Sequence, residues 1–246
     1  MTDASASAPQ TPTDNASVAE DFIDIFIAPA KVFARRAKAS PMTPYLTVCV
    51  MMIVLFFASK NVLQPIFDAQ MQKGLDAAMK SNPQMTPDVL EKARPMMNAT
   101  VTIGGVIGVP ILLVIIALVT WILGRFIMGG ELSFGGALMI TSFSWFPRII
   151  GSVLGLVQGL VLDVTKMTSP VQLSFSPARF LDAGSMTDGK LQLIGQLDLF
   201  TIWCMALVAI GLMKAAKLDK GKAISVAVIL FVVGCIPSLI AIAKGN

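Results

Sequence analysis

The chain has 246 residues, of which 55% are hydrophobic and 14% are charged. Ordinary soluble domains carry about 25% charged residues, so this composition argues against a water-soluble domain and indicates a protein that resides in lipid. The net charge of +4 is small, and the basic residues cluster in separate loops rather than along one face, which argues against nucleic-acid binding.

Residues 1–16 are polar and are expected to form a disordered cytoplasmic tail, without the basic start and apolar run of a secretory signal. A helix is expected to begin at Ser17, because Ser17 and Glu20 have the spacing of a capping box. Aromatic residues then recur at helical spacing: Phe22, Phe26 and Phe33. We therefore predict a cytoplasmic amphipathic helix over residues 17–40, bent at Pro29, which lies in the membrane interface or packs as a soluble helix on the rest of the protein.

Five segments are long and apolar enough to cross the membrane, since a helix needs about 20 mostly apolar residues to span ~30 Å of hydrocarbon. They cover about residues 43–63, 99–123, 134–162, 193–213 and 223–243. Strands of a membrane barrel would be about 10 residues long and would alternate polar with apolar residues, and these segments do neither. Residues 41–246 are therefore predicted to form an all-α bundle of five transmembrane helices.

The orientation of this bundle follows from the Lys and Arg residues of its loops. Bases precede the first span, follow the second span and fill the link between the fourth and fifth spans: Lys31, Arg35, Arg36, Lys38, Arg125, Lys214, Lys217, Lys220 and Lys222. The bases in the two longer loops on the other side are matched by acids. This distribution predicts a multi-pass protein with its N-terminus in the cytoplasm and its C-terminus outside.

Arg148, which directly follows Pro147 in the third predicted span, is the strongest candidate for a functional residue. A cation near the membrane centre costs ~2.5–3.5 kcal/mol even on insertion scales, so it must face a partner or water. Asp198 is the only acid well inside a predicted span, and we expect an intramembrane ion pair between it and Arg148. The pair could act as a gate, as a lipid-headgroup site or as a structural clip.

Glycines recur every fourth residue in two of the predicted spans. Gly104 and Gly108 lie in the second span, and Gly151, Gly155 and Gly159 lie in the third. Glycines at this spacing share one helix face and allow a second backbone to approach closely. Both stripes fall in the outer half of the bilayer, so we expect the second and third spans to pack through them. A substrate path or a homodimer face is the alternative.

Histidine is absent from the chain, which excludes zinc proteases, Ser-His and Cys-His nucleophile pairs, and haem ligation by His. The sequence also contains no phosphate-binding loop of the GxxxxGK type. The cysteines Cys49, Cys204 and Cys235 lie in apolar runs, where we expect them to act as small hydrophobic residues rather than as a disulfide framework. No catalytic residue, metal site or cofactor is therefore expected, and the protein is not expected to be an enzyme.

Three stretches of the sequence resemble the Yip family of integral membrane proteins, which is named for interaction with Ypt/Rab GTPases. They are GRFIMGGELSFGGALMITSFSWFP at 124–147, LDLFTIWCMALVAIGL at 197–212 and FIDIFIAPAKVF at 22–33. In the first stretch, Gly124, Gly130 and Pro147 stand where the family has its glycine-containing cytoplasmic turn and the proline of its third span. The resemblance implies five spans and a cytoplasmic N-terminus.

Eukaryotic members of that family act in vesicle trafficking by binding small GTPases and reshaping membranes. This chain has a short N-terminus without their acidic, tyrosine-rich region, which argues against GTPase binding and favours a prokaryotic type. The resemblance implies a non-enzymatic inner-membrane protein with a membrane-organising or protein-interaction role. Its expected partners are membrane lipids and other membrane proteins or a second copy of the chain. The alternative is a small transporter or channel, for example for lipid, with a site around Arg148 and Asp198.

Overall fold

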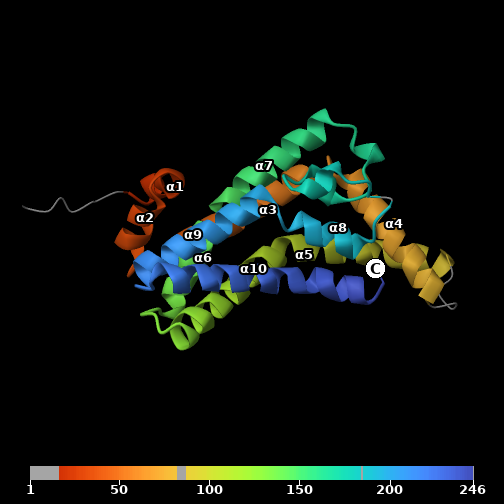
Figure 1. The fold of residues 1–246 in the computed structure, drawn as a ribbon. Coiled ribbons are helices and arrows are strands. Elements are labelled where there is room, and N and C mark those ends of the chain that lie inside the picture. Colours follow the sequence, from red (N-terminus) through yellow and green to blue (C-terminus); the bar gives the residue numbers. More distant parts are fainter. Residues whose placement is uncertain (1–16, 82–86, 184, 246) are drawn as a thin grey trace, which may run out of the picture.

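The computed structural model describes residues 17–81, 87–183 and 185–245, and every regular element within these ranges is a helix. Figure 1 shows an elongated bundle whose long helices run back and forth between two ends. One end, called the α1 end here, holds helices α1 (Val18–Ile27) and α2 (Pro29–Arg36). The other end, called the α4 end, holds helix α4 (Gln64–Ser81) and the C-terminus.

The long helical segments alternate in direction along the chain; α6 and α7 follow one another in one direction as a single segment, and α8 and α9 form another, bent one. Their bounds are Met42–Lys60 for α3, Pro87–Trp121 for α5, Phe134–Ser144 for α6, Phe146–Val161 for α7, Asp188–Gly195 for α8, Leu199–Ala215 for α9 and Lys220–Ala243 for α10. Helix α5 continues into a wider π-helical turn, η1 (Ile122–Ile127). Three short 3₁₀ turns, η2 (Val164–Lys166), η3 (Pro170–Leu173) and η4 (Pro177–Phe180), lie between α7 and α8.

Within the described residues, four helical segments are long and apolar enough to cross a membrane: Met42–Lys60, Glu91–Ile127, Phe134–Val161 and Lys220–Ala243. Helices α8 and α9 meet the same criterion only as a pair, and they are bent by 50° at the break between them. The predicted all-α membrane bundle is confirmed, with four spans by length and composition, or five if the bent pair also crosses.

The surfaces of these segments support a lipid environment. Large apolar side chains such as Ile107, Ile111 and Ile115 of α5 are exposed. Soluble monomers rarely expose contiguous apolar surface on this scale, because water disfavours it. Lipid tails cover such a surface at no comparable cost, so the exposed apolar faces have a simple physical explanation.

Helix α6 lies at the centre of the bundle. Every residue from Ala137 to Ser144 is buried, and α6 packs against α3, α5 and α9. Its close contact with α9 depends on Gly211, where a Cβ atom would lie 2.6 Å from Cγ2 of Ile140. The hydroxyl groups of Thr141 and Ser144 are buried and find no hydrogen-bond partner among the described residues. The other spans are thus arranged around a helix that combines apolar and small hydroxyl side chains.

The third predicted span, 134–162, consists of two helices rather than one. Helix α6 ends at Ser144, Trp145 donates its N–H to the carbonyl of Ser142 at 3.1 Å, and α7 begins at Phe146. Pro147 stands in the first turn of α7, where its missing N–H costs no helical hydrogen bond. The proline therefore occupies a helix start instead of kinking one continuous helix.

The N-terminal segment, predicted as one helix over 17–40, also divides into two. Ala28 leaves the helical conformation, with φ of −139°, and Pro29 begins α2. Two short helices joined at this point form a hairpin, called the α1–α2 hairpin here. The tail predicted for residues 1–16 lies outside the described residues.

Two turns at the α1 end are joined to each other. Lys217, between α9 and α10, places its Nζ 2.6 Å from Oε2 of Glu131, between η1 and α6. The N–H of Glu131 donates to the carbonyl of Ala216 at 3.0 Å, and Lys222 Nζ donates to the carbonyl of Met128 at 3.1 Å. The hydrogen bond and charge of the Lys217 ammonium lower the pKa of the Glu131 carboxyl. These turns therefore lie on the same side of the bundle.

Candidate functional site

Arg148, the leading candidate from the sequence, lies in the first turn of α7 and is half-buried. Its Nη2 donates to Oγ1 of Thr201 in α9 at 3.0 Å. Its guanidinium carbon lies 5.2 Å from the ring centroid of Trp145, within the range of a cation–π contact. Arg148 therefore has a hydroxyl partner and an aromatic partner at the contact between α7 and α9.

Asp198 has a different role from the one expected. It caps the N-terminus of α9, where its Oδ1 accepts the N–H groups of Phe200 at 2.9 Å and Thr201 at 3.3 Å. Its Oδ2 accepts the N–H of Phe175 at 2.8 Å. An aspartate at a helix N-cap satisfies backbone donors that would otherwise lack partners. The carboxylate thus holds the start of α9 and the preceding loop.

The predicted ion pair between Arg148 and Asp198 is wrong. Among the residues that the structure describes, neither side chain takes part in a salt bridge, and the two contact different atoms of Thr201. The bend between α8 and α9 explains this, because Asp198 leaves the helix to act as a cap and turns its oxygens toward the backbone of α9. Thr201 contacts both residues, and no sequence pattern pointed to it.

The glycines of the two predicted stripes do not pack against each other. At Gly104 and Gly108 of α5, an added Cβ atom would meet nothing within 4 Å. At Gly151 of α7, it would lie 2.8 Å from Cδ2 of Phe200 in α9. The tight contact of α7 is thus with α9, and the expected packing of the second span on the third through glycines is wrong.

The remaining glycines of the third span differ from one another. Gly159 is buried against Val62 and Leu63, where an added Cβ would lie 2.9 and 2.7 Å from their side chains. Gly155, one turn earlier on α7, has nothing within 4 Å. The contact of Gly159 with residues 62 and 63 holds the end of α7 against the link between α3 and α4. Helix packing through glycine is therefore real at Gly151 and Gly159, with partners that spacing did not identify.

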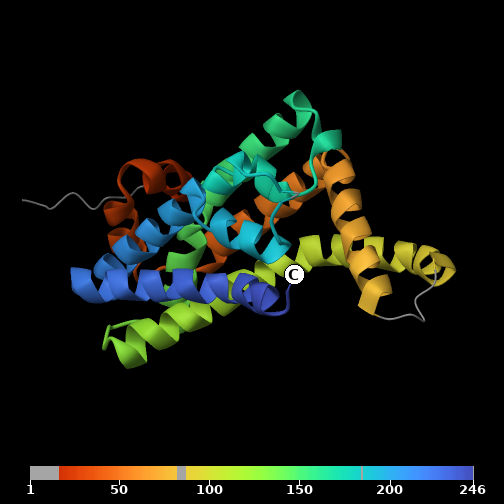
Figure 2. The same cartoon turned by 45° about the vertical axis from the view of Figure 1, so that its right-hand side comes forward.

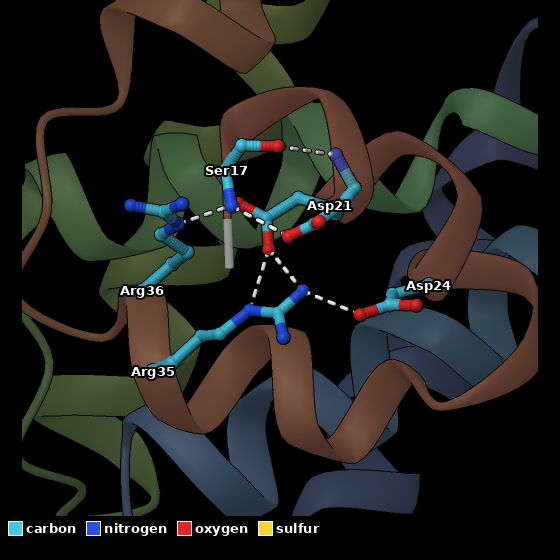
Figure 3. Close-up of polar contacts among 6 residues, drawn as sticks. Ser17, Asp21, Asp24, Arg35 and Arg36 are labelled. Carbon is cyan, nitrogen blue, oxygen red and sulfur yellow. Dashed lines mark hydrogen bonds and ion pairs between the residues drawn. The ribbon is translucent and has the colours of Figure 1, made fainter. Parts of the chain in front are cut away.

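The α1–α2 hairpin contains an ion cluster that the sequence did not reveal (Figure 3). Nε of Arg35 lies 2.6 Å from Oδ1 of Asp21, and Nη2 of Arg35 lies 2.6 Å from Oδ2 of Asp24. Arg36 also binds Asp21, through Oδ2. The Asp21 side chain is 0% exposed. Two guanidinium groups therefore neutralise a fully buried carboxylate and close the hairpin.

The start of the hairpin follows the predicted capping box. Ser17 Oγ accepts the N–H of Glu20 at 3.2 Å, and Glu20 Oε2 accepts the N–H of Ser17 at 2.7 Å. Figure 3 shows these bonds beside the contact between Asp21 and the two arginines. The first turn of α1 is therefore fixed by its own side chains next to the ion cluster.

Aromatic contacts hold this hairpin on the bundle. The ring centroid of Phe22 lies 5.0 Å from that of Phe146, and Phe26 meets Trp203 edge-on at 5.6 Å. Phe33 contacts Phe143 of the central helix edge-on at 6.4 Å. Aromatic pairs in this range add about 0.5–1.5 kcal/mol each beyond the burial of their area. The hairpin is therefore an integral part of the helical core.

Within residues 17–81, 87–183 and 185–245, no three His, Cys, Asp or Glu side chains are grouped so that they could hold a metal ion. Cys49, Cys204 and Cys235 are buried and free, and buried cysteines of this kind pack as small hydrophobic residues. The described polar groups near Arg148 are therefore suited to packing and to hydrogen bonding rather than to metal binding.

The comparison with protein families matches the Yip1 domain to residues 23–242 of the chain. This range begins inside α1 and ends inside α10, so it includes the ion cluster partners on α2, the Arg148 contact and the membrane-spanning helices. Neither a curated protein nor a solved structure was found to match the chain. Because the match covers most of its length, the chain belongs to the Yip1 domain family of membrane proteins.

Proposed function

We propose that this protein is a non-enzymatic component of a bacterial inner membrane that organises the membrane or binds other membrane proteins. The observation that carries the proposal is the α1–α2 hairpin, which lies within the matched Yip1 domain from residue 23 onward. The hairpin is fixed to the bundle by Phe22, Phe26 and Phe33. An element of this kind, fixed to the bundle and exposed on its outer face, suits recognition of a partner.

The proposed orientation places the hairpin in the cytoplasm. The α1 end carries exposed basic residues in three separate segments, including Lys31 on α2, Arg125 on η1 and Lys217 before α10. Lys and Arg in short loops favour the cytoplasmic side. The C-terminus at the α4 end would then lie outside the cell.

The outer face of the hairpin is suited to contact with lipid or with another membrane protein. Ile23 is 64% exposed and Ile27 is 77% exposed, and both lie on α1. Lys31 and Lys38 are exposed on the following segment. Apolar side chains beside basic ones are typical of helices that lie at the surface of an anionic membrane. We therefore propose membrane lipids and other membrane proteins as the partners of this face.

The transporter alternative receives less support from the arrangement around Arg148. Its guanidinium is occupied by Thr201 and Trp145. Two pockets between α3, α4 and α5 are lined by neither Arg148 nor Asp198. A polar path would require water or substrate to reach the guanidinium, so the contacts at Arg148 favour a structural clip.

Reconstitution into sealed liposomes separates the two functions. A membrane-organising protein is expected to leave the efflux of a trapped small solute, and the transbilayer movement of a labelled lipid, at the level of protein-free liposomes. In native membranes, a photoreactive residue in place of Ile27 should crosslink to lipid or to another membrane protein. The same residue in place of Val32, which is buried, serves as the control. Flux that is abolished by Arg148→Met would overturn the proposal in favour of transport.

A further inference from the structure

A pocket between α4 and α5 lies apart from the Arg148 contact. It has a volume of about 370 Å³ and is lined largely by apolar side chains, among them Phe67 and Met71 of α4 and Met97 and Val101 of α5. Figures 1 and 2 show α4 crossing the first part of α5 at the α4 end. Small-molecule sites have volumes of about 300–1,000 Å³, so this pocket can hold part of a ligand.

A smaller pocket continues the first one toward α3. It shares Phe67, Met71 and Val101 with the larger pocket and is also lined by Lys60 and Asp68. The joined pocket therefore has an apolar part and a part that carries one cation and one anion. An amphiphile has the same division, with an apolar chain attached to a charged headgroup.

The two charged side chains are placed to meet a ligand. Lys60 is the last residue of α3, a candidate span, so its ammonium lies where lipid headgroups begin. Its Nζ donates to Oγ1 of Thr102 at 2.9 Å, and Oδ1 of Asp68 accepts from Gln64 at 2.8 Å. Neither Lys60 nor Asp68 takes part in a salt bridge with another described residue. Both charges are therefore available to a headgroup.

We propose that this pocket binds a zwitterionic phospholipid with an amine headgroup, of the phosphatidylethanolamine class. Lys60 binds the phosphate and Asp68 binds the ammonium of the headgroup. One acyl chain runs from the pocket past Val101 along α5 toward the membrane centre, and the methionines Met71 and Met97 adapt to the part of the lipid that lies in the pocket. An anionic lipid lacks the ammonium and would place its charge near the Asp68 carboxylate, so charge complementarity favours the zwitterionic class.

The surface of α5 provides room for the rest of the lipid's acyl chain. Gly104 and Gly108 lie on the same face of α5 as Met97 and Val101, because these positions are three or four residues apart. At both glycines, an added Cβ atom would meet nothing within 4 Å. Thr102, to which Lys60 donates, lies at the same level as this ammonium, and from Thr102 to Gly108 the helix rises about 9 Å, more than half of the ~15 Å depth of one leaflet. The open strip thus extends from the pocket along one leaflet.

Two polar contacts beyond the pocket join α4 to its neighbours. Nη2 of Arg94 in α5 donates to Oε1 of Gln72 in α4 at 2.8 Å. Lys73 of α4 lies 3.6 Å from Asp188 at the start of α8. The first contact joins α4 to α5 and the second joins α4 to α8, and exposed contacts of this kind contribute little stability individually.

The test is native mass spectrometry of the full-length protein in mild detergent, with phosphatidylethanolamine or phosphatidylglycerol added at equal concentrations. We expect more phosphatidylethanolamine to remain bound, and Lys60→Met to lower its apparent affinity about tenfold because a charge-assisted hydrogen bond is lost. Lys60→Arg should retain binding. Asp68→Asn should remove the preference for phosphatidylethanolamine over phosphatidylglycerol.

Two matched variants act as controls for general damage. Gly104→Leu should weaken binding by occupying the strip, whereas Gly155→Leu, at an equally open glycine on α7, should not. Lys92→Met removes an exposed base near the start of α5 and should leave binding unchanged. Equal retention of the two lipids by the wild type, or binding that is insensitive to both Lys60→Met and Gly104→Leu, would overturn the proposal. Because the readout is lipid retained by purified protein, it does not depend on the flux and crosslinking results that test the proposed function.

Discussion

Asp21 is the residue on which the N-terminal structure depends most directly. Its carboxylate is completely buried and bound by Arg35 and Arg36, and burying an ion is tolerated only when its partners remain in place. We predict that Asp21→Ala lowers the stability of the protein by about 3 kcal/mol, since it leaves two guanidinium groups without a shared carboxylate. The loss should be measurable as a lower midpoint of thermal unfolding in detergent.

Asp24 provides the matched control for this experiment. It binds the same Arg35 but is partly exposed to solvent, so Asp24→Ala should have a clearly smaller effect than Asp21→Ala. Proteolysis should also distinguish the variants, because loss of the cluster is expected to free α1 and α2 for cleavage. Similar unfolding midpoints for the two variants would contradict the importance of burial at Asp21.

Substitutions at Asp198 can separate its role as a helix cap from any effect of its negative charge. The side chain accepts three backbone N–H groups, and asparagine caps helices about as well as aspartate. We predict that Asp198→Asn unfolds close to the wild type, whereas Asp198→Ala loses about 1–2 kcal/mol. Thermal unfolding in detergent measures the difference. If Asn and Ala cause equal losses, the charge of Asp198 matters and the assignment of a cap is wrong.

Residues close together in the sequence were predictable, and distant contacts were not. Ser17 and Glu20 form the predicted capping box, because both partners belong to one helical turn. Arg148 was correctly expected to need a polar partner, yet that partner is Thr201, 53 positions away. A threonine inside an apolar run has no distinctive pattern, since hydroxyl side chains commonly bond to their own helix.

At the scale of helices, Gly151 and Gly155 give a direct comparison on one helix. A Cβ atom at Gly151 would lie 2.8 Å from Phe200 of α9, whereas one at Gly155 would meet nothing within 4 Å. We predict that Gly151→Leu costs about 1–3 kcal/mol through overpacking, while Gly155→Leu is neutral or slightly stabilising because leucine favours helix. Unfolding in detergent provides the measurement. Equal losses at both sites would show that α7 does not pack on α9 through Gly151.

The contact between the two turns at the α1 end predicts that the stability of the folded protein depends on pH. The Lys217 ammonium lowers the pKa of Glu131 below its usual value of 4.5, so the folded state binds this proton less readily than the unfolded state does. The stabilising contribution is therefore present above the usual pKa and is lost as the pH falls through the lowered one. Between about pH 5 and about pH 3, the unfolding midpoint of the wild type should fall further than that of Glu131→Gln.

Helix breaks were harder to predict than helices, and three of them show why. Apolar runs of about 20 residues identify spans reliably because lipid requires helical backbone there. The breaks at Ala28, Trp145 and Asp198 each lie beside a recognisable residue, namely Pro29, Pro147 or the aspartate itself. Both prolines lie in the first turn of a new helix and Asp198 caps one, but the same residues also occur in bent, continuous helices. Only packing against neighbouring helices selects between the two outcomes.

At the scale of the whole molecule, the two ends of the bundle contain different elements. The α1 end combines the hairpin with two turns linked by Glu131 and Lys217. The α4 end contains α4, the short helices after α7 and the proposed lipid pocket. Because the long helices alternate between these ends (Figure 1), each exposed loop should be accessible from one side of the membrane.

The position of the turn before α10 bears on how many times the polypeptide crosses the membrane. If α8 and α9 together form a span, the turn before α10 is on the cytoplasmic side with the N-terminus. If they do not cross, that turn would lie outside and α10 would bring the C-terminus into the cytoplasm. The contact between Lys217 and Glu131 places the turn before α10 beside the turn after η1, and these two turns must then share one side. We therefore expect five crossings.

A membrane-impermeant maleimide tests this expectation, because Cys49, Cys204 and Cys235 are buried and should react little. Lys244→Cys, at the end of α10, should be labelled in intact cells that express the protein. Lys220→Cys, at the start of α10, should be labelled only after the membrane is permeabilised. Labelling of Lys220→Cys but not Lys244→Cys in intact cells would mean that α8 and α9 do not cross, or that the whole bundle is inverted. Ala19→Cys in α1 separates these cases, since its labelling in intact cells would indicate inversion.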